Sequence, residues 1–166
     1  MAVQKLLESL RLLLRLYREL IDLGWKKKDQ VIGNRLNDLT ETLAKESRVL
    51  KQLAEAETAR VQAVLAFQRE LGLQENPEAK LAELAEWMTD PAGKTELLHL
   101  MDDIGRAAGE LRELNERNQK LVRQALGMVE AQLDLFAGVP EEEAVYRAPT
   151  RGAAEPKRSG LFDVWA

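Results

Sequence analysis

Apolar residues recur at spacings of three and four along most of this chain, which is the pattern of amphipathic helices. The first such stretch runs from about Val3 to Ile32. Its expected inner face consists of Leu6, Leu10, Leu13, Tyr17, Leu20 and Ile21. Leu12, Leu16 and Leu23 widen this face, so we expect the first helix to lie centrally among its neighbours.

The dipeptide Gly33-Asn34 interrupts the pattern and predicts a helix C-cap followed at once by an N-cap. We expect a second helix from there to about Leu71. Its predicted inner stripe is Leu36, Leu39, Leu43, Leu50, Leu53, Val61, Val64 and Leu71. So short a link favours two antiparallel helices. One bent helix is the alternative, because a glycine alone does not force a turn.

Two cap-then-proline signatures follow the second helix. Gly72 ends that helix, and Asn76-Pro77 predicts a short third helix through about Thr89. The inner face of the third helix should be Leu81, Leu84, Ala85 and Met88, with Trp87 beside it. Asp90-Pro91 then predicts a last helix that continues to about Ala137, because proline is well tolerated in a first helical turn. At 1.5 Å per residue this helix would be roughly 70 Å long and would need a partner along most of its length.

Three rows with a seven-residue repeat run along the last helix. The central row is Leu100, Ala107, Leu114, Leu121, Met128 and Leu135. One flanking row is Leu97, Ile104, Leu111, Asn118 and Ala125, and the other is Met101, Ala108, Asn115, Val122, Val129 and Phe136. The repeat predicts packing of helix on helix. Leu126 and Leu133 carry the apolar surface onto the outer face, which predicts a second contact with a partner; packing against the first helix is the alternative.

Asn115 and Asn118 place two amides beside the central leucine row. Asparagine is a poor helix former and is costly to bury without hydrogen-bond partners. We therefore expect the pair to set a packing register or to orient a partner. Exposure to solvent without a special role is the alternative.

The helical pattern stops at Gly138-Val139-Pro140, which divides the chain into a helical domain, 1–138, and a tail, 139–166, expected to be flexible. The tail ends on an apolar stretch, 161–166, which should dock either on the protein itself or on a partner. The predicted fold is all-α: an elongated antiparallel helical bundle or coiled coil of about three long helices and one short helix, followed by this tail.

Composition supports this fold and narrows the classes of partner. The 166 residues are 31% charged and 5% aromatic, with a net charge of -4, which favours long helices and argues against nucleic acid as a partner. Cysteine is absent, so neither a disulfide framework nor a thiolate metal site is expected. Charged residues such as Glu8, Arg11 and Arg15 interrupt the N-terminal leucines. We therefore expect no signal peptide and no membrane insertion, but a soluble cytoplasmic protein.

No catalytic constellation is readable. His99, the one histidine, has no second histidine or cysteine with which to bind a metal. No phosphate-binding loop or nucleophile elbow is evident, so we expect no enzyme activity, no metal and no cofactor. Gly105 and Gly109 have the GxxxG spacing, which here predicts close helix approach or a flexible helix middle.

Three motifs carry a family resemblance: the leucine spacing of the second helix, the Leu114-Asn115-x-x-Asn118-x-x-Leu121 core of the last helix, and the Phe162-Asp163 ending of the tail. Together they resemble the FlgN family of flagellar type III export chaperones. The second helix matches the family with its leucine spacing, an acidic position at Glu46 and a late Arg60. The last helix matches the L-N-x-x-N-x-x-L core with Leu114, Asn115, Asn118 and Leu121. The tail matches with Tyr146 and with an F-D-x-x-A ending at Phe162, Asp163 and Ala166. Two positions depart from the family: Asn34 replaces a common acidic residue, and Trp165 replaces a basic one.

The resemblance implies a chaperone for the hook–filament junction proteins FlgK and FlgL, which would bind their C-terminal helical segments and deliver them to the export gate. The expected client-binding residues are Asn115, Asn118, Leu121, Val122, Leu126, Val129, Leu133 and Phe136. By the same resemblance, Tyr146 would contact the export gate, and Leu161, Phe162 and Trp165 would shield the client surface. A self-associating coiled-coil scaffold, or an adapter for another helix, is the alternative function.

Overall fold

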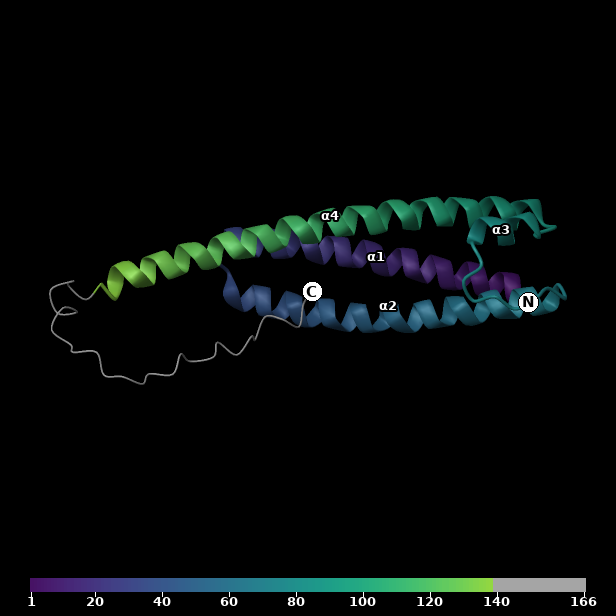
Figure 1. The fold of residues 1–166 in the computed structure, drawn as a ribbon, viewed down its shortest axis with the longest axis horizontal. Coiled ribbons are helices and arrows are strands. Elements are labelled where there is room, and N and C mark those ends of the chain that lie inside the picture. Colours follow the sequence, from purple (N-terminus) through teal and green to yellow (C-terminus); the bar gives the residue numbers. More distant parts are fainter. Residues whose placement is uncertain (139–166) are drawn as a thin grey trace, which may run out of the picture. The chain divides into compact units, whose positions relative to one another are not determined.

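The computed structural model describes residues 1–138, which form four helices and no strand: α1 Ala2–Ile32, α2 Leu36–Glu70, α3 Leu81–Glu86 and α4 Pro91–Phe136 (Figure 1). The expected all-α class, with three long helices and one short one, is confirmed. The chain divides into two compact units, Met1–Gly127 and Met128–Ala166, so that α4 begins in the first unit and ends in the second. The predicted tail lies outside the described residues.

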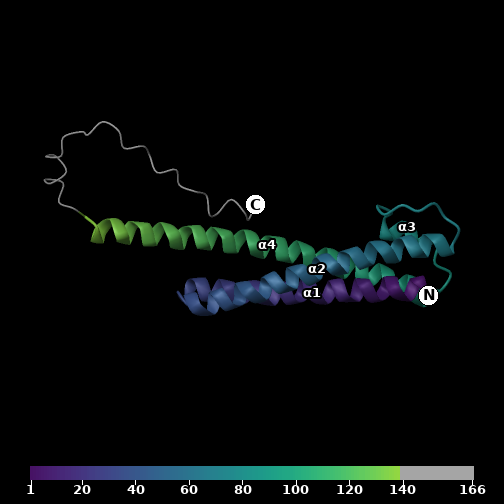
Figure 2. The same ribbon diagram turned by 90° about the horizontal axis from the view of Figure 1, so that it is seen from below.

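The first two helices form a hairpin. Figures 1 and 2 show α1 and α2 side by side and running in opposite directions. The start of α1 is joined to the end of α2, where the Ala2 amide donates to both oxygens of Glu70, at 3.2 and 3.3 Å. The prediction of antiparallel helices is confirmed, and the alternative of one bent helix is wrong.

The turn between α1 and α2 differs in detail from the prediction. Gly33 has an ordinary negative φ of -81°, whereas Asn34 has a φ of +53°. Asn34 therefore takes the left-handed conformation, which asparagine tolerates better than most residues. Arg35, not Asn34, is the N-cap of α2, and its side chain makes no capping hydrogen bond.

The core of Met1–Gly127 is built around α1. Twelve α1 residues are buried, compared with seven in α2. The expected inner face is confirmed, because five of its six residues are buried and Tyr17 is half-buried. Leu16 and Leu23 are buried as well, so the covered part of α1 is wider than a single contact stripe. This is the central position that the sequence predicts for the first helix.

The buried face of α2 is not the predicted leucine stripe. Leu36, Leu43, Leu50 and Leu71 are exposed, and only Val64 of the predicted set is buried. The buried positions that repeat every seven residues are instead Thr42, Val49, Ala56 and Ala63. Small side chains let α2 lie close to the broad leucine face of α1, and larger leucines would be overpacked there.

The connection between α2 and α4 contains a shorter helix than expected. The Asn76 side chain accepts a 2.9 Å hydrogen bond from the Glu78 amide, which forms a turn and delays the start of α3 to Leu81. Leu84, Ala85 and Met88 are buried as predicted, and Leu81 is half-buried. Asp90 caps α4 as expected, because its carboxylate accepts from the amides of Ala92 and Gly93.

Candidate partner-binding surface

Within Met1–Gly127, α4 packs through the rows that the heptad repeat predicts. Leu97, Leu100, Ala107 and Leu114 are buried, and Leu111 is half-buried. An ion pair between Arg11 and Glu96 ties the first turns of α4 to α1. This part of α4 is therefore occupied by contacts within the protein itself.

One close approach fixes α4 against α1. A Cβ built on Gly24 would lie 2.6 Å from Cδ2 of Leu114, so no side chain larger than hydrogen fits there without movement. On the next turn of α4, Asn118 Nδ2 donates a 2.9 Å hydrogen bond to the Gly24 carbonyl oxygen. The sequence offers one signal for Gly24, namely a glycine inside a strongly helical stretch, which usually has a packing reason.

The two asparagines of the LNxxNxxL core have different surroundings. Asn118 is 6% exposed and lies in the α1–α4 contact, with its Oδ1 buried and without a hydrogen-bond partner among residues 1–138. Asn115, three residues earlier, is exposed. Of the two predicted roles, Asn118 therefore has the surroundings of a register residue, and Asn115 alone is available on the surface.

From Leu121 onward the α4 surface opens to solvent. Leu121 is half-buried, whereas Val122 is 39% and Leu126 is 45% exposed. In the second unit, the part of α4 from Met128 to Phe136 is exposed throughout. Its exposed large apolar residues are Met128, Val129, Leu133, Leu135 and Phe136. Helices of soluble proteins rarely leave so many large apolar side chains in water without a partner to cover them.

A second set of exposed leucines lies on α2, at Leu36, Leu43 and Leu50. These three residues recur every seven positions and therefore share one face. We call them the α2 leucine row. The prediction that these leucines belong to the core is wrong: the repeat is visible in the sequence, but it lies on an exposed face of α2.

Glu46 and Arg60, the charged positions on which the family resemblance rests in α2, both form ion pairs. Lys27 Nζ lies 2.6 Å from Glu46 Oε2, and each of these side chains is 15% exposed. This pair links α1 to α2. Arg60 pairs with Glu57 on the same helix. The acidic position thus has a structural role in the hairpin, where removing one partner would leave a poorly hydrated charge.

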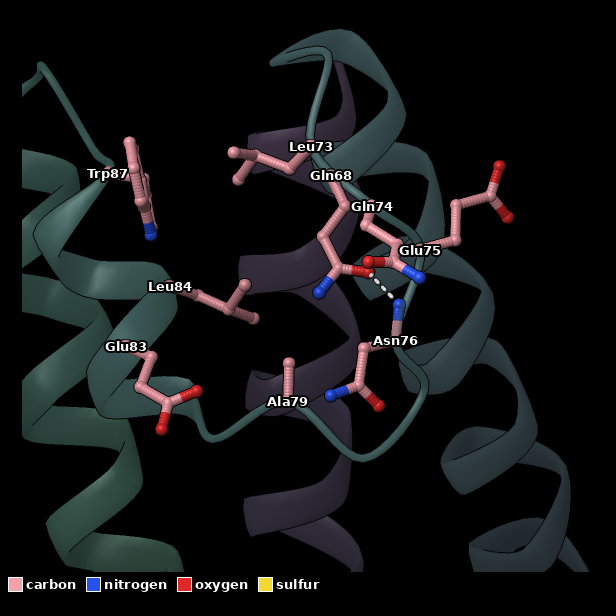
Figure 3. Close-up of a pocket in the computed structure, with 9 residues that line it drawn as sticks. All are labelled: Gln68, Leu73, Gln74, Glu75, Asn76, Ala79, Glu83, Leu84 and Trp87. Carbon is pink, nitrogen blue, oxygen red and sulfur yellow. Dashed lines mark hydrogen bonds between the residues drawn. The ribbon is translucent and has the colours of Figure 1, made fainter.

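A hollow of about 560 Å³ lies between the end of α2, the connection 71–80 and α3. Figure 3 shows Leu73 and Trp87 on opposite sides of it, with Leu84 and Ala79 below them. The buried Gln68 accepts a 2.8 Å hydrogen bond from the Asn76 amide. At its rim, the hydrogen bond from Arg69 lowers the pKa of Glu75. The titratable side chains that line this hollow are the carboxylates of Glu75 and Glu83.

The remaining predicted features carry no site among residues 1–138. His99 is exposed, and no group of three or more potential metal ligands occurs in this part of the chain. Gly105 and Gly109 are exposed, and a Cβ built on either would have no atom within 4 Å apart from the local backbone of its own helix and its chain neighbours, so the predicted close approach at this pair is wrong. No helix described by the structure is both long enough and apolar enough to cross a membrane. Tyr146, Leu161, Phe162 and Trp165 lie outside the described residues.

Comparison with known proteins places these features in a family. The FlgN protein family matches residues 1–151 of the chain. A relative from Bacillus subtilis (strain 168), named "Uncharacterized protein YvyG", is 28% identical over 165 residues, which are 98% of each chain. No solved structure matches significantly.

Proposed function

Because this chain belongs to the FlgN family, whose membership indicates a flagellar export chaperone, we propose that its clients are the hook–filament junction proteins FlgK and FlgL. It binds their C-terminal helical segments in the cytoplasm, prevents premature assembly and delivers them to the export gate. The observation that carries this proposal is the exposed apolar surface of α4 from Val122 onward.

The exposed residues of α4 have the spacing that a partner helix requires. Val122, Leu126, Val129, Leu133 and Phe136 follow one another at intervals of four and three along one helix. This spacing forms a continuous apolar stripe, against which the apolar face of an amphipathic client helix can pack. Burial contributes about 25 cal/mol for each Å² of apolar surface, reduced by the cost of ordering the client.

The polar residues of the LNxxNxxL core divide into two roles in this proposal. Asn115 is exposed one turn before Gln119 and two turns before Val122, where its amide can orient a client backbone or side chain. Asn118 holds α4 in register with α1 and acts on the client only by keeping the stripe in place. Leu121, which is half-buried, supports the stripe from below.

The tail residues complete the proposal by family resemblance. Tyr146 contacts the export gate, and Leu161, Phe162 and Trp165 cover the client-binding stripe until a client displaces them. A chain truncated after Gly138 should then lose gate binding and gain client affinity. Unchanged gate binding and unchanged client affinity would rule out this role of the tail.

Client binding is tested with purified chain and the C-terminal helical segments of FlgK and FlgL from the same genome. We expect a one-to-one complex by calorimetry, and we expect L126E and L133E each to abolish it while far-UV circular dichroism and Tm stay unchanged. If these substitutions unfold the protein, the residues belong to the core and the site is misplaced. If the unmodified chain binds neither segment, the proposed clients are wrong.

Self-association through the same stripe is the competing function, since long apolar stripes also pair with copies of themselves. Sedimentation at micromolar concentration separates the two. A monomer that forms a defined complex with a client supports the chaperone, and a stable dimer or larger assembly that binds no client supports a scaffold.

A further inference from the structure

The α2 leucine row runs from solvent into the core. Leu36, Leu43 and Leu50 are 66%, 44% and 38% exposed. The same seven-residue series continues through Glu57 to Val64, which is fully buried. One face of α2 is therefore covered near the end of the helix and uncovered near its start.

The residues beside the row are those of a packing face. Next to the leucines lie Thr40, Ala44, Ser47 and Ala54, all of them small and uncharged. The charges beside the row are Lys51, Glu57 and Glu46, and the Glu46 carboxylate is paired with Lys27 of α1. Other charges of this part of α2 gather on another edge, where Lys45 and Arg48 line a shallow hollow with Glu19 and Lys26 of α1. A solvated helix face normally carries its charges outward. This face has the composition of one that meets another helix.

The α2 leucine row and the open part of α4 lie at the same end of Met1–Gly127. Gly24 contacts Leu114 and Asn118, so the following turns of α4 lie beside the end of α1. The hairpin turn at Gly33 and Asn34 follows within three turns of α1, and the leucine row begins directly after it. On α4 the exposed positions at this end are Val122 and Leu126.

This end of the unit is basic, although the whole chain has a net charge of -4. Residues 112–127 contain four basic and two acidic side chains, and residues 25–38 contain the same numbers. By contrast, residues 53–90, which include the end of α2 and all of α3, contain three basic and eight acidic side chains. A partner that binds at the hairpin end therefore meets excess positive charge around an apolar surface.

We propose that the α2 leucine row is a second contact for the client, so that one amphipathic client helix with acidic residues along the edges of its apolar face touches both α2 and α4. This inference rests on the proposed function and names the chemistry of its partner. The apolar face of the client covers Leu43, Leu50 and Leu126, and its acidic edges meet cations such as Lys120 and Arg123.

The test compares L43E and L50E with the matched control L98E, because Leu98 and Leu50 are equally exposed, at 38%. We expect L43E and L50E each to weaken binding of the FlgK or FlgL segment by about ten-fold or more, as for a truncated interface anchor, while L98E leaves binding unchanged. Circular dichroism and Tm are measured for all three variants. Should a glutamate variant lose helicity, L43S or L50S replaces it. The variant R123E should also weaken binding, and added salt should weaken binding to the unmodified chain more than to R123E.

The outcomes separate this inference from the proposed function. If L126E abolishes binding while L43E and L50E bind as the unmodified chain does, the proposed function stands and the second contact is wrong. If neither segment binds the unmodified chain, both fail. If the chain alone is a dimer that L43E converts to a monomer without a change in client affinity, the α2 leucine row is a face between two copies, and this inference is overturned.

Discussion

Asn118 Nδ2 donates a 2.9 Å hydrogen bond to the Gly24 carbonyl oxygen and thereby joins α4 to α1 across 94 positions of sequence. The bond is buried, and Asn118 Oδ1 has no hydrogen-bond partner within residues 1–138. A leucine at this position would bury more apolar surface and leave no unsatisfied oxygen. A half-satisfied amide in an apolar contact is the arrangement by which coiled coils define one register at some loss of stability.

The variant N118D should destabilise the protein by about 2–4 kcal/mol at neutral pH, because a buried carboxylate cannot donate to the Gly24 carbonyl. Burial beside a carbonyl raises the pKa of the new carboxyl in the folded state. Relative to the unmodified chain, N118D should therefore be least destabilised below pH of about 4 and should lose stability as the pH rises through that raised pKa. Urea unfolding at several pH values measures this.

Asn115 offers the matched control, since it is exposed on the same helix. The variant N115D should change the free energy of unfolding by less than about 0.5 kcal/mol at any of these pH values. Equal effects of N118D and N115D would show that the Asn118 amide does not hold α4 against α1.

The variant G24A should destabilise the protein by about 1–2 kcal/mol. Its Cβ would lie 2.6 Å from the buried Leu114 side chain, and the resulting overpacking outweighs the higher helix propensity of alanine. In G109A the new methyl group meets no atom within 4 Å beyond its chain neighbours and the local backbone of its own helix, so this variant should be more stable than the unmodified chain by about 0.5–1 kcal/mol. Thermal unfolding of both variants shows whether each substitution stabilises or destabilises the protein. A G24A variant more stable than the unmodified chain would contradict the close approach of α1 and α4.

The sequence predicts the helices of this fold well and the orientation of α2 poorly. Spacing and cap signals locate α1 and the start of α4 within a residue or two, because caps and apolar periodicity act locally. In α2 the leucines are the more hydrophobic candidates for the core, yet Ala56 and Ala63 are buried and Leu43 is not. Which face of α2 is buried depends on the shape of α1, and from Thr42 to Ala63 that face carries smaller side chains than leucine, whereas Phe67 is buried near the end of α2.

The candidate site is also predictable as far as local apolar periodicity determines it, and not where the position of a neighbouring helix decides which side chain is buried. The apolar surplus on α4 is visible in sequence at Leu126 and Leu133, and both side chains are exposed. Asn115 and Asn118 cannot be told apart in sequence, because residues three apart are neighbours on a helix surface and only the position of α1 decides which one is buried. The α2 leucine row is missed because a leucine repeat normally indicates a core.

The burial of Ala56 and the exposure of Leu43 on α2 predict opposite sensitivities to substitution at these two positions. The variant A56L places a large side chain in the tight α1–α2 contact, where Ala56 is 3% exposed, and should destabilise the protein by about 1–3 kcal/mol. L43A removes a half-exposed side chain and should cost about 1 kcal/mol or less. Urea unfolding of the two variants measures both changes. A larger effect of L43A than of A56L would mean that the leucine stripe is the core face after all.

The ion pair between Lys27 and Glu46 should stabilise the hairpin more than a surface pair does. Both side chains are 15% exposed, so K27M leaves the Glu46 carboxylate without its partner in a poorly hydrated place and should cost about 1–3 kcal/mol. The variant K45M removes the partner of Glu41, but the Glu41 side chain is 67% exposed and stays hydrated. The free energy of unfolding should therefore change by less than about 0.5 kcal/mol. The double variant K27M/E46L removes both charges and should recover most of the loss, because a buried pair can often be replaced by apolar residues of similar volume. If K27M is no worse than K45M, water screens the pair, and the acidic position of the family motif needs an explanation outside the hairpin.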